Sequence, residues 1–582
     1  MKTVTSDYTR ATALDRSLGD PRDPANPYGF AASAARDLAE EFPKALAEAV
    51  GPSLRAAFVP AEDGGDLVSA DTTLMLVRAA ARRDASVMPA TMFSITAATC
   101  VLLGGSPEQR ENVLRVLRSG GAVGFALSEE GHGSDLLANS CSAEDDGAGT
   151  LLLNGEKWLV GSGGRCTALL LVARTGGRGP AAFSTLLLEG TEVEEARTTV
   201  RHRFTGMRGI DFAAFSFEDL RVPRERMVGR PGHGLETAMK AMQVVRTMST
   251  GAGLACADTG LRLAMDFAER HRVAGRAALD HVHVRRELAT AGALLFAGEV
   301  AALAAARGLH VLPAAQSLWS SVAKKVLTEV SEEVFDRCAD VLGTRAVLRD
   351  GDFAAFDSAR RDNAMVRFID TGPVANARLV AAHLPRLAKS RRDRTDPPSA
   401  ELESVYRLDA PLPSLRLEGL ELSDRGGDAA LDAMETLVAR TAETVREDGT
   451  LSPRDKARAL VLVNALKRTS GPLLTAAGRK GLGDQEKIDL SHRLCYVHAA
   501  VSCLHLWWSN RHLPLFGGRP GDVGWLNAVL NVLLDRANGH RRTLPDQEAA
   551  AVIGLVEHLH DTDRMFSCAA LPLAESPARP RT

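Results

Sequence analysis

The chain of 582 residues has few cysteines, few aromatic residues and little net charge. Its eight cysteines contain no C-x-x-C pair, which is typical of packed thiols in a reducing compartment rather than of a disulfide framework. The formal net charge of −3 provides no field that would attract nucleic acid or an anionic membrane. The N-terminus lacks an apolar targeting segment, and no uninterrupted apolar stretch is long enough to span a bilayer. We therefore expect a cytoplasmic protein that binds no nucleic acid.

The spacing of the apolar residues changes twice along the chain. From Ala31 to Gly120 they recur every three to four residues, as in helices. Between Ala122 and Pro223, short apolar runs separated by Gly, Asp and Asn indicate β-strands, and from Gly232 the helical pattern returns. We predict six segments, which are an N-terminal arm (1–28), a helical domain (29–121), a β-domain (122–228), a helical bundle (229–388), a Pro- and Arg-rich linker (389–424) and a further helical domain (425–582).

The most informative segment runs from Gly124 to Asp135. An apolar, strand-like start leads into two acids and then into a Gly-x-Gly-Ser-Asp turn. Glycines let the backbone approach a ligand closely and expose its N–H groups, and the hydroxyl of Ser134 adds a donor. The turn is suited to the phosphates or the ring edge of a cofactor, and a plain glycine-rich turn is the alternative.

Three further motifs follow in order. Asn154-Gly155 opens the segment up to Gly163 and predicts a hairpin turn. The segment Phe215–Pro223 is the end of a strand, and Gly232-His233-Gly234 opens a long helical pattern.

These motifs resemble those of the acyl-CoA dehydrogenase and acyl-CoA oxidase superfamily, which are T/S-E-x-x-x-G-S-D, N-G-x-K, F-x-x-V/L-x-V-P and G-x-G in the same order. The resemblance covers roughly residues 30–385. It implies a mainly α fold with a central β-domain: an N-terminal helical domain, a β-barrel-like middle domain and a C-terminal four-helix bundle. The extra C-terminal helical domain resembles that of acyl-CoA oxidases and of very-long-chain-type dehydrogenases.

The resemblance also implies a reaction, in which a base removes the α-proton of an acyl thioester while FAD accepts a hydride from the β-carbon. The family places its base in a segment R-D-x-x-x-x-x-x-Y-E-G-T, and Arg361–Gly372 matches this segment with Asp370 at the position of the base. Aspartate is one methylene shorter than the usual glutamate, although nitroalkane oxidases of the superfamily use aspartate here. A turn or helix-capping role is the alternative for Asp370.

Four residues of the first motif match positions that line the flavin in the family, namely Phe125, Leu127, Ser128 and Ser134. The aromatic and hydroxyl residues that the family places after the N-G-x-K motif are replaced by Leu159 and Gly161. Trp158 is displaced by one position, which in a regular strand turns a side chain to the opposite face, so we expect it in the core.

In the family a neighbouring subunit completes the cofactor site, which implies a homodimer or homotetramer. Arg270 and Arg272 match a segment that binds the pyrophosphate, although Ala274 replaces an aromatic residue there. Asp340 replaces the glutamine of Q-x-x-G-G, and its carboxylate would repel a pyrophosphate. Arg246 matches an arginine near the active-site entrance and is a candidate substrate contact, with a salt bridge within the helix as the alternative.

A cluster of histidines and cysteines lies in the last helical domain, at His492, Cys495, His498, Cys503 and His505. Its spacing does not match the paired ligands of a zinc site, and the flanking residues are apolar. We expect a packed core there and no metal.

The sequence therefore predicts a FAD-dependent oxidoreductase that introduces an α,β-double bond into an acyl thioester carried by coenzyme A or by an acyl carrier protein. Its electrons would pass to an acceptor flavoprotein or to oxygen. One alternative is a flavin oxidase of the same superfamily, similar to an acyl-CoA oxidase or a nitroalkane oxidase. The changes at Asp340, Leu159 and Gly161 favour a third possibility, a flavin-less scaffold or partner subunit with the same fold.

Overall fold

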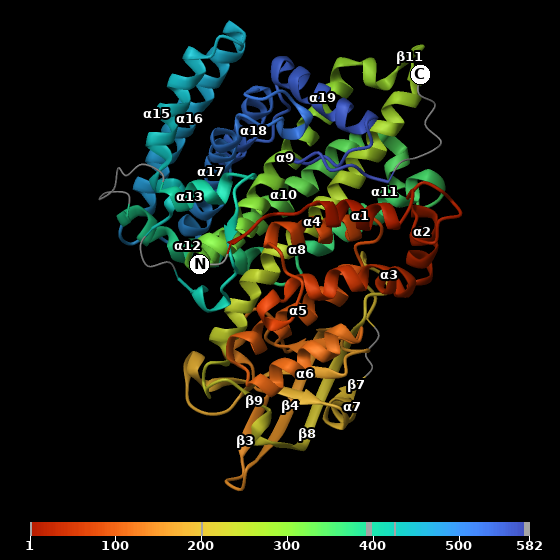
Figure 1. Cartoon of the computed structure of the whole chain (residues 1–582), viewed down its shortest axis with the longest axis vertical. Coiled ribbons are helices and arrows are strands. Elements are labelled where there is room, and N and C mark those ends of the chain that lie inside the picture. The colour runs from red at the N-terminus through yellow and green to blue at the C-terminus, as the bar shows by residue number, and fades with distance from the viewer. Residues whose placement is uncertain (1–2, 199–201, 391–398, 424–426, 575–582) are drawn as a thin grey trace.

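The computed structural model describes residues 3–198, 202–390, 399–423 and 427–574. Parts of the predicted linker (391–398 and 424) and both chain ends (1–2 and 575–582) lie outside the described residues. Figure 1 shows the β-domain at the lower end of the molecule, the long helices α8, α9 and α10 through the middle, and the C-terminal helices at the upper end.

The N-terminal region is helical, as predicted for residues 29–121, and one further helix, α1, lies within the predicted arm. Its helices are α1 (Thr9–Ser17), α2 (Phe30–Ala39), α3 (Lys44–Arg55), α4 (Ala70–Ala81), α5 (Val87–Gly104) and α6 (Pro107–Arg118). The start of α6 is fixed by local chemistry: the Ser106 side chain accepts from the backbone N–H of Gln109, the Gln109 side chain accepts from that of Ser106, and Pro107 occupies the first helical position.

The middle region forms one eight-stranded sheet in the order β7-β8-β4-β3-β5-β6-β9, with β2 pairing alongside β5. Its strands are β2 (Val123–Ala126), β3 (Ser142–Asp145), β4 (Thr150–Gly161), β5 (Ala168–Arg174), β6 (Phe183–Glu189), β7 (Arg197–Thr198), β8 (Phe212–Pro223) and β9 (Met227–Val228). A short helix, α7 (Thr191–Ala196), precedes β7.

The predicted hairpin turn at Asn154-Gly155 is wrong, because both residues lie inside β4. The turn that joins β3 to β4 is at residues 146–149 instead. The Asn154 side chain is exposed at a register shift and exchanges two hydrogen bonds of 3.0 Å with Asp219 on β8. Gly155 has a φ of 116° and its Cα faces the backbone of Cys141 so closely that a Cβ would lie 2.7 Å from Cys141 Cα. The glycine is needed here for close strand packing rather than for a turn.

Alternation along β2 divides the core into two parts. Val123, Phe125 and Leu127 belong to a large hydrophobic core shared with the helices, whereas Ala122 and Ala126 point into a smaller core inside the β-domain. One face of this strand is therefore directed at the helical part of the molecule.

The bundle consists of α8 (Gly234–Arg270), α9 (Val282–Val311), α10 (Gln316–Leu342), α11 (Ala354–Val366) and α12 (Pro373–Ser390). The pair β10 (Arg272–Val273) and β11 (Arg276–Ala277) forms the tip between α8 and α9. The C-terminal unit contains α14 (Ala429–Asp432), α15 (Met434–Glu447), α16 (Pro453–Ala477), α17 (Asp484–Asn510), α18 (Gly524–Ala537) and α19 (Asp546–Asp561), and α13 (Ala400–Tyr406) precedes it. The helical core runs without a break from the N-terminal helices through the bundle into this unit, so packing alone does not divide these parts, and the predicted domain boundaries stay a prediction.

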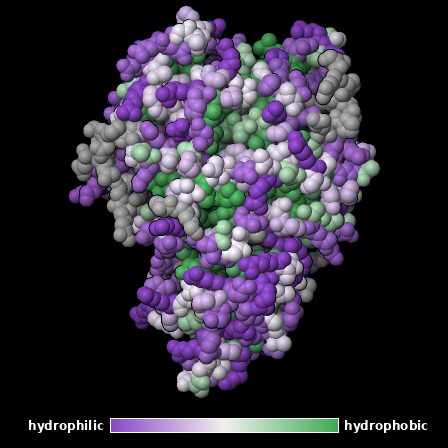
Figure 2. All heavy atoms as spheres, in the orientation of Figure 1, coloured by the Kyte–Doolittle hydropathy of each residue, from purple (hydrophilic) through white to green (hydrophobic). Residues whose placement is uncertain are grey.

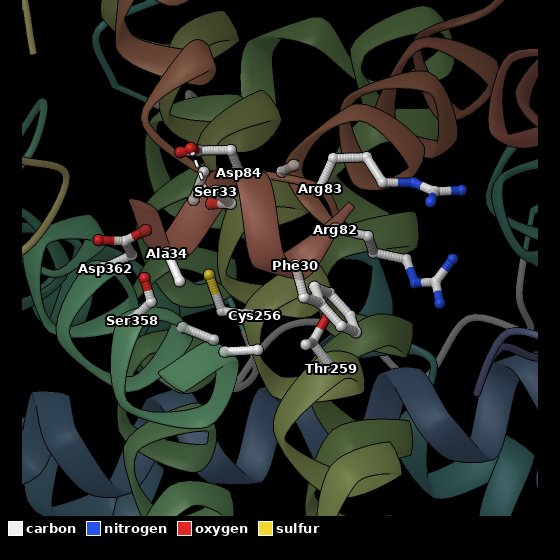
Figure 3. Close-up of a pocket in the computed structure, with 14 residues that line it drawn as sticks. Phe30, Ser33, Ala34, Arg82, Arg83, Asp84, Cys256, Thr259, Ser358 and Asp362 are labelled. Carbon is white, nitrogen blue, oxygen red and sulfur yellow. Dashed lines mark hydrogen bonds between the residues drawn. The ribbon is translucent and has the colours of Figure 1, made fainter. Parts of the chain in front are cut away.

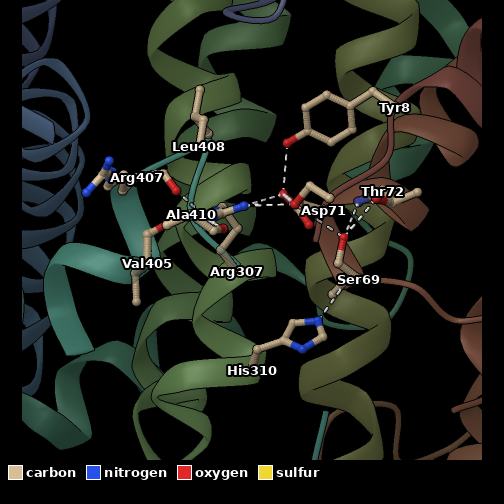
Figure 4. Close-up of polar contacts among 12 residues, drawn as sticks. Tyr8, Ser69, Asp71, Thr72, Arg307, His310, Val405, Arg407, Leu408 and Ala410 are labelled. Atoms are coloured by element: carbon tan, nitrogen blue, oxygen red, sulfur yellow. Dashed lines mark hydrogen bonds and ion pairs between the residues drawn. The ribbon is translucent and has the colours of Figure 1, made fainter. Parts of the chain in front are cut away.

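Buried ion pairs tie the chain ends and the linker to the bundle. Strand β1 (Thr3–Val4) pairs with β12 (Leu412–Pro413). Beside it, Arg307 on α9 forms a fully buried ion pair of 2.8 Å with Asp71 on α4, and Tyr8 donates a 2.8 Å hydrogen bond to the same carboxylate (Figure 4). Arg307 also donates to the carbonyl oxygens of Val405 and Arg407. Its side chain therefore connects α9 to α4 and to the segment around residues 405–407.

Among the residues that the structure describes, two helices, α5 and α9, are long and apolar enough to cross a membrane by length and composition alone. Both are largely or wholly buried inside the protein, as core helices are. On the face shown in Figure 2 the lower lobe is mostly hydrophilic, and apolar residues gather in the middle of the molecule above it.

Candidate active site

Asp370 lies in the turn between α11 and α12, with only 2% of its side chain exposed. Its backbone has a φ of 68°, a left-handed conformation that costs a non-glycine residue about 1–2 kcal/mol. The carboxylate faces the ammonium group of Lys324 on α10 at 3.4 Å, and the lysine side chain is equally buried. The predicted base is therefore a buried carboxylate held in a strained turn, in an ion pair that the sequence did not suggest.

Arg246 on α8 reaches the same turn. Its guanidinium donates to the Thr371 hydroxyl at 3.0 Å and to the hydroxyls of Ser320 and Ser321 at 3.2 and 3.3 Å. Burial lowers the pKa of Arg246 to about 10, and the nearby charge of Asp370 opposes this shift. The expected substrate contact and the expected base are thus brought together, and among the described residues Arg246 makes no ion pair within α8.

The glycine turn after β2 is exposed and its hydroxyl groups are available. A Cβ added at Gly131 or Gly133 would meet nothing within 4 Å. Ser128 is half-buried and Ser134 is exposed, and within the described part of the chain neither hydroxyl has a hydrogen-bond partner. Such free donors beside open space are suited to the phosphates of an anionic cofactor.

A buried ion pair supports this turn from behind. The Lys157 ammonium lies 2.9 Å from Glu129 and 3.0 Å from the Leu127 carbonyl oxygen, and the Glu129 carboxylate accepts the backbone N–H groups of Ser140 and Cys141. Burial would raise the pKa of Glu129, but these N–H groups and Lys157 hold that pKa below its usual value. The ion pair of Lys157 and Glu129 therefore fixes the start of the turn, while Gly131 and Gly133 at its tip face open space.

Phe125 and Leu127 are placed differently from the two serines. Both are nearly buried, at 8% and 6% exposure, and they pack within the large helical core. They lie on the β2 face that is directed at the helices, and their contact with a flavin stays a prediction.

The end of β4 corrects the expectation for Trp158. Lys157 pairs with Phe215 and Val160 with Ala213, so one extra residue is accommodated in a β-bulge. Lys157 and Val160 are buried, and Trp158 and Leu159 between them are half-exposed on the outer side. The bulge absorbs the one-residue displacement, so Trp158 lies outside both hydrophobic cores, where its indole N–H is 3.2 Å from His202.

Gly161, two residues further on, is covered by the ring of Phe93 from α5. A Cβ at this glycine would overlap the ring. Phe93 in turn contacts Phe212, with ring centroids 5.9 Å apart, and Phe212 contacts Phe204 at 5.3 Å. An aromatic cluster therefore covers this end of β4.

Arg270 and Arg272 lie at the tip between α8 and α9, exposed to solvent. Arg270 and Arg246 are 24 positions apart on one helix, a separation of roughly 36 Å at 1.5 Å per residue. These arginines are therefore remote from Asp370 within the chain, and a role at a cofactor of a neighbouring subunit stays a prediction. Asp340, near the end of α10, is also exposed.

Two cavities lie away from these residues. The smaller, of about 30 Å³, has room for a water molecule and is lined by Asp84, Asp362, Ser33 and Cys256 among others (Figure 3). Burial and then the neighbouring Asp84 raise the pKa of Asp362 to about 7. The other cavity lies beside α2 and α3 near Tyr28 and Phe42. Neither contains Asp370, Arg246 or the glycine turn.

The histidine and cysteine cluster of α17 is packed as expected. Cys495 and Cys503 are buried, His498 lies 3.2 Å from Asp428, and His505 lies 3.2 Å from the Ala430 carbonyl oxygen.

Known proteins share this architecture. The profile described as acyl-CoA dehydrogenase, middle domain, matches residues 124–220, and the profile described as acyl-CoA dehydrogenase, C-terminal domain, matches residues 232–370. The two matched segments are therefore similar to the acyl-CoA dehydrogenase family, and about two thirds of the chain shares the fold of solved acyl-CoA dehydrogenases.

Individual relatives agree with this assignment. The probable acyl-CoA dehydrogenase FadE25 of Mycobacterium tuberculosis is 28% identical over 242 residues, which cover 41% of this chain and 62% of the relative. The chain thus matches about three fifths of that protein. Butyryl-CoA dehydrogenase from Megasphaera elsdenii superposes with a TM-score of 0.59 at 20% identity, covering 66% of this chain and 100% of that structure. The prolyl acyl carrier protein oxidase AnaB superposes with a TM-score of 0.56 at 20% identity, covering 65% and 97%.

Proposed function

We propose that the protein is a FAD-dependent oxidoreductase that removes two hydrogens from the α and β carbons of an acyl thioester. The observation that carries the proposal is the meeting of Asp370 and Arg246 at one buried turn, within a segment that matches the C-terminal domain profile of acyl-CoA dehydrogenases.

The residues of the turn have complementary roles in this reaction. The carboxylate of Asp370 would accept the α-proton of the thioester. Removal of that proton places negative charge on the thioester oxygen, and the buried cations Arg246 and Lys324 provide the positive surroundings that favour it.

The residues near the glycine turn fit FAD. The hydroxyls of Ser128 and Ser134 and the open turn at Gly131 and Gly133 would hold its anionic part, and the helix-facing side of β2 would lie against its ring. When bound, FAD supplies the acceptor for the hydride that leaves the β-carbon. We also propose that Arg270 and Arg272 complete the site of a second subunit in a homodimer or homotetramer.

The thioester carrier is either coenzyme A or an acyl carrier protein; the names of the butyryl-CoA dehydrogenase and of AnaB support one each. We favour an acceptor flavoprotein over oxygen as the electron acceptor, and a cytoplasmic location.

The experiment is a visible spectrum of protein purified in the presence of FAD, followed by incubation with CoA thioesters of graded chain length and with acyl carrier protein thioesters. We expect a yellow protein and a thioester product that lacks two hydrogens. Hydrogen peroxide formed at the turnover rate would identify an oxidase instead.

One observation favours a flavin-less scaffold as the second candidate. The ring of Phe93 covers Gly161 at the strand end that the family uses for the flavin. A colourless protein that also fails to bind FAD in calorimetry would support this candidate.

A further inference from the structure

Lys324 on α10 connects three elements that meet at Asp370. Its ammonium group lies 3.1 Å from the Ser249 hydroxyl on α8, 2.7 Å from the carbonyl oxygen of Val366 at the end of α11, and 3.0 Å from that of Ile369 in the turn. The fourth contact is the Asp370 carboxylate at 3.4 Å. A lysine with four oxygen neighbours and almost no exposure is an unusual component of a helix core.

The four contacts are unequal. An ammonium group has three N–H donors, and the two carbonyl oxygens and the Ser249 hydroxyl are the three nearest acceptors. The Ser249 hydroxyl donates its own proton to the Arg246 carbonyl oxygen, so its oxygen is free to accept. Lys324 is thus anchored by neutral groups, while Asp370 is held mainly by charge. The carboxylate can turn toward a substrate without leaving a buried donor unsatisfied.

The same contacts fix the backbone around Asp370. The carbonyl groups of Val366 and Ile369 follow the last turn of α11, where carbonyl oxygens have no partner within the helix. Lys324 binds both of them, and Ile369 also accepts the backbone N–H of Thr371 at 2.9 Å. These bonds enclose the left-handed residue Asp370 and hold it in its strained conformation.

Charge at the turn is unbalanced in favour of cations. Lys324 and Arg246 are both buried beside a single carboxylate, and Arg246 itself donates only to hydroxyl groups. The carboxylate of Asp370 therefore lies beside two buried cations.

We propose that Lys324 is a positioning residue for Asp370, which fixes the turn that carries the carboxylate. This inference rests on the proposed function, because it names the group that makes the proposed base competent.

The test compares three substitutions at Lys324 with a matched control. Lys324→Met removes charge and hydrogen bonds, Lys324→Gln removes the charge but keeps donors, and Lys324→Arg keeps the charge. Lys325→Met is the control, since the neighbouring lysine is also buried on α10 but pairs with Glu329, which accepts from Tyr496 of the C-terminal unit.

The first measurement is the kcat and the KM of the flavin-loaded protein. We expect Lys324→Met and Lys324→Gln to lower kcat by about tenfold or more with little change in KM, because the turn no longer holds the carboxylate in place for proton transfer. Lys324→Arg should recover part of the loss, and Lys325→Met should leave kcat and KM unchanged. An unchanged kcat in Lys324→Gln overturns the proposal, and this variant carries the test if Lys324→Met does not fold.

The second measurement needs no substrate. Melting temperatures of wild type, Lys324→Gln, Asp370→Asn and the double variant form a cycle in which we expect the two effects to be strongly non-additive at neutral pH. Additive effects overturn the pairing. If the wild-type protein turns over no acyl thioester, the proposed function fails, and the cycle still decides whether Lys324 controls Asp370.

Discussion

The glycine turn and the turn at Asp370 differ in exposure: the first is open to solvent, and the second has buried side chains. Around Gly131 and Ser134 the chain leaves donors free and space open, and it places the supporting charges Glu129 and Lys157 beneath the turn. Around Asp370 the side chains are buried and held by ion-pair or hydrogen-bond contacts. A surface with free donors is suited to bind a polar cofactor, whereas a buried cluster with several polar contacts is suited to hold one reactive group in place.

The largest effect is expected where the buried cluster loses its carboxylate. Asp370→Asn keeps the size of the side chain but removes the proposed base, so kcat should fall by about 10²–10⁴ while the flavin content stays normal. Asp362→Asn is the control, since it neutralises another buried carboxylate of the same segment outside the cluster. Steady-state rates and flavin absorbance measure both effects, and wild-type turnover in Asp370→Asn would locate the proton acceptor elsewhere.

A second prediction concerns the Phe93 ring that covers the end of β4. Gly161→Val should lower the free energy of unfolding by about 1–3 kcal/mol, because its side chain would overlap the Phe93 ring. Adding Phe93→Ala should recover part of this loss by providing room. Melting curves of the two single variants and the double variant test the contact; equal losses in Gly161→Val with and without Phe93 would contradict it.

A single hydroxyl donor of the glycine turn should have a smaller effect, which we expect on the affinity for FAD. Ser134→Ala removes one exposed hydroxyl, and a single hydrogen bond of about 1 kcal/mol corresponds to about a fivefold weaker Kd for FAD. Calorimetric titration of the apoprotein measures this change, with Ser119→Ala on the distant end of α6 as a control hydroxyl. Unaltered FAD affinity in Ser134→Ala would remove this serine from the proposed site.

The smallest expected effect is a pH dependence of the folding stability, caused by Asp362 outside both turns. The pKa of Asp362 is raised to about 7 by burial and by Asp84, above its value in an unfolded chain. The folded protein therefore binds more protons than the unfolded chain between about pH 4 and 7, and this contribution to stability is lost as the pH rises through that window. Asp362→Asn should gain in melting temperature relative to wild type as the pH rises from about 5 to 8. A constant difference across this range would contradict the raised pKa.

Much of the architecture follows from local patterns. The Gly-x-Gly start of α8, the capping residues of α6 and the alternation along β2 are short-range signals, and each is present in the structure. Asn154-Gly155 was misinterpreted because its local preference for a turn is outweighed by strand pairing with β8 and by the contact with Cys141. The face of Trp158 depends on a bulge, which no period-two pattern reveals.

The candidate site was only partly accessible from the sequence. Asp370, Arg246 and the two serines come from motifs, and the structure brings Asp370 and Arg246 together. Lys324 was missed because a lysine within an apolar helical stretch gives no sign of being buried until its partners from α8 and α11 are known. Phe93 was missed for a similar reason, since its contact with Gly161 joins positions far apart in the chain.

Rapid anaerobic mixing of the FAD-loaded protein with acyl thioesters tests the central claim most directly. Loss of the oxidised flavin absorbance reports the reaction at Asp370 and the cofactor site in one trace. We expect the oxidised flavin absorbance of the wild-type protein to be lost rapidly with at least one acyl thioester. In Asp370→Asn this loss should be slower by about 10²-fold or more. A protein that binds no FAD, or one that is reduced equally fast in both forms, would contradict it.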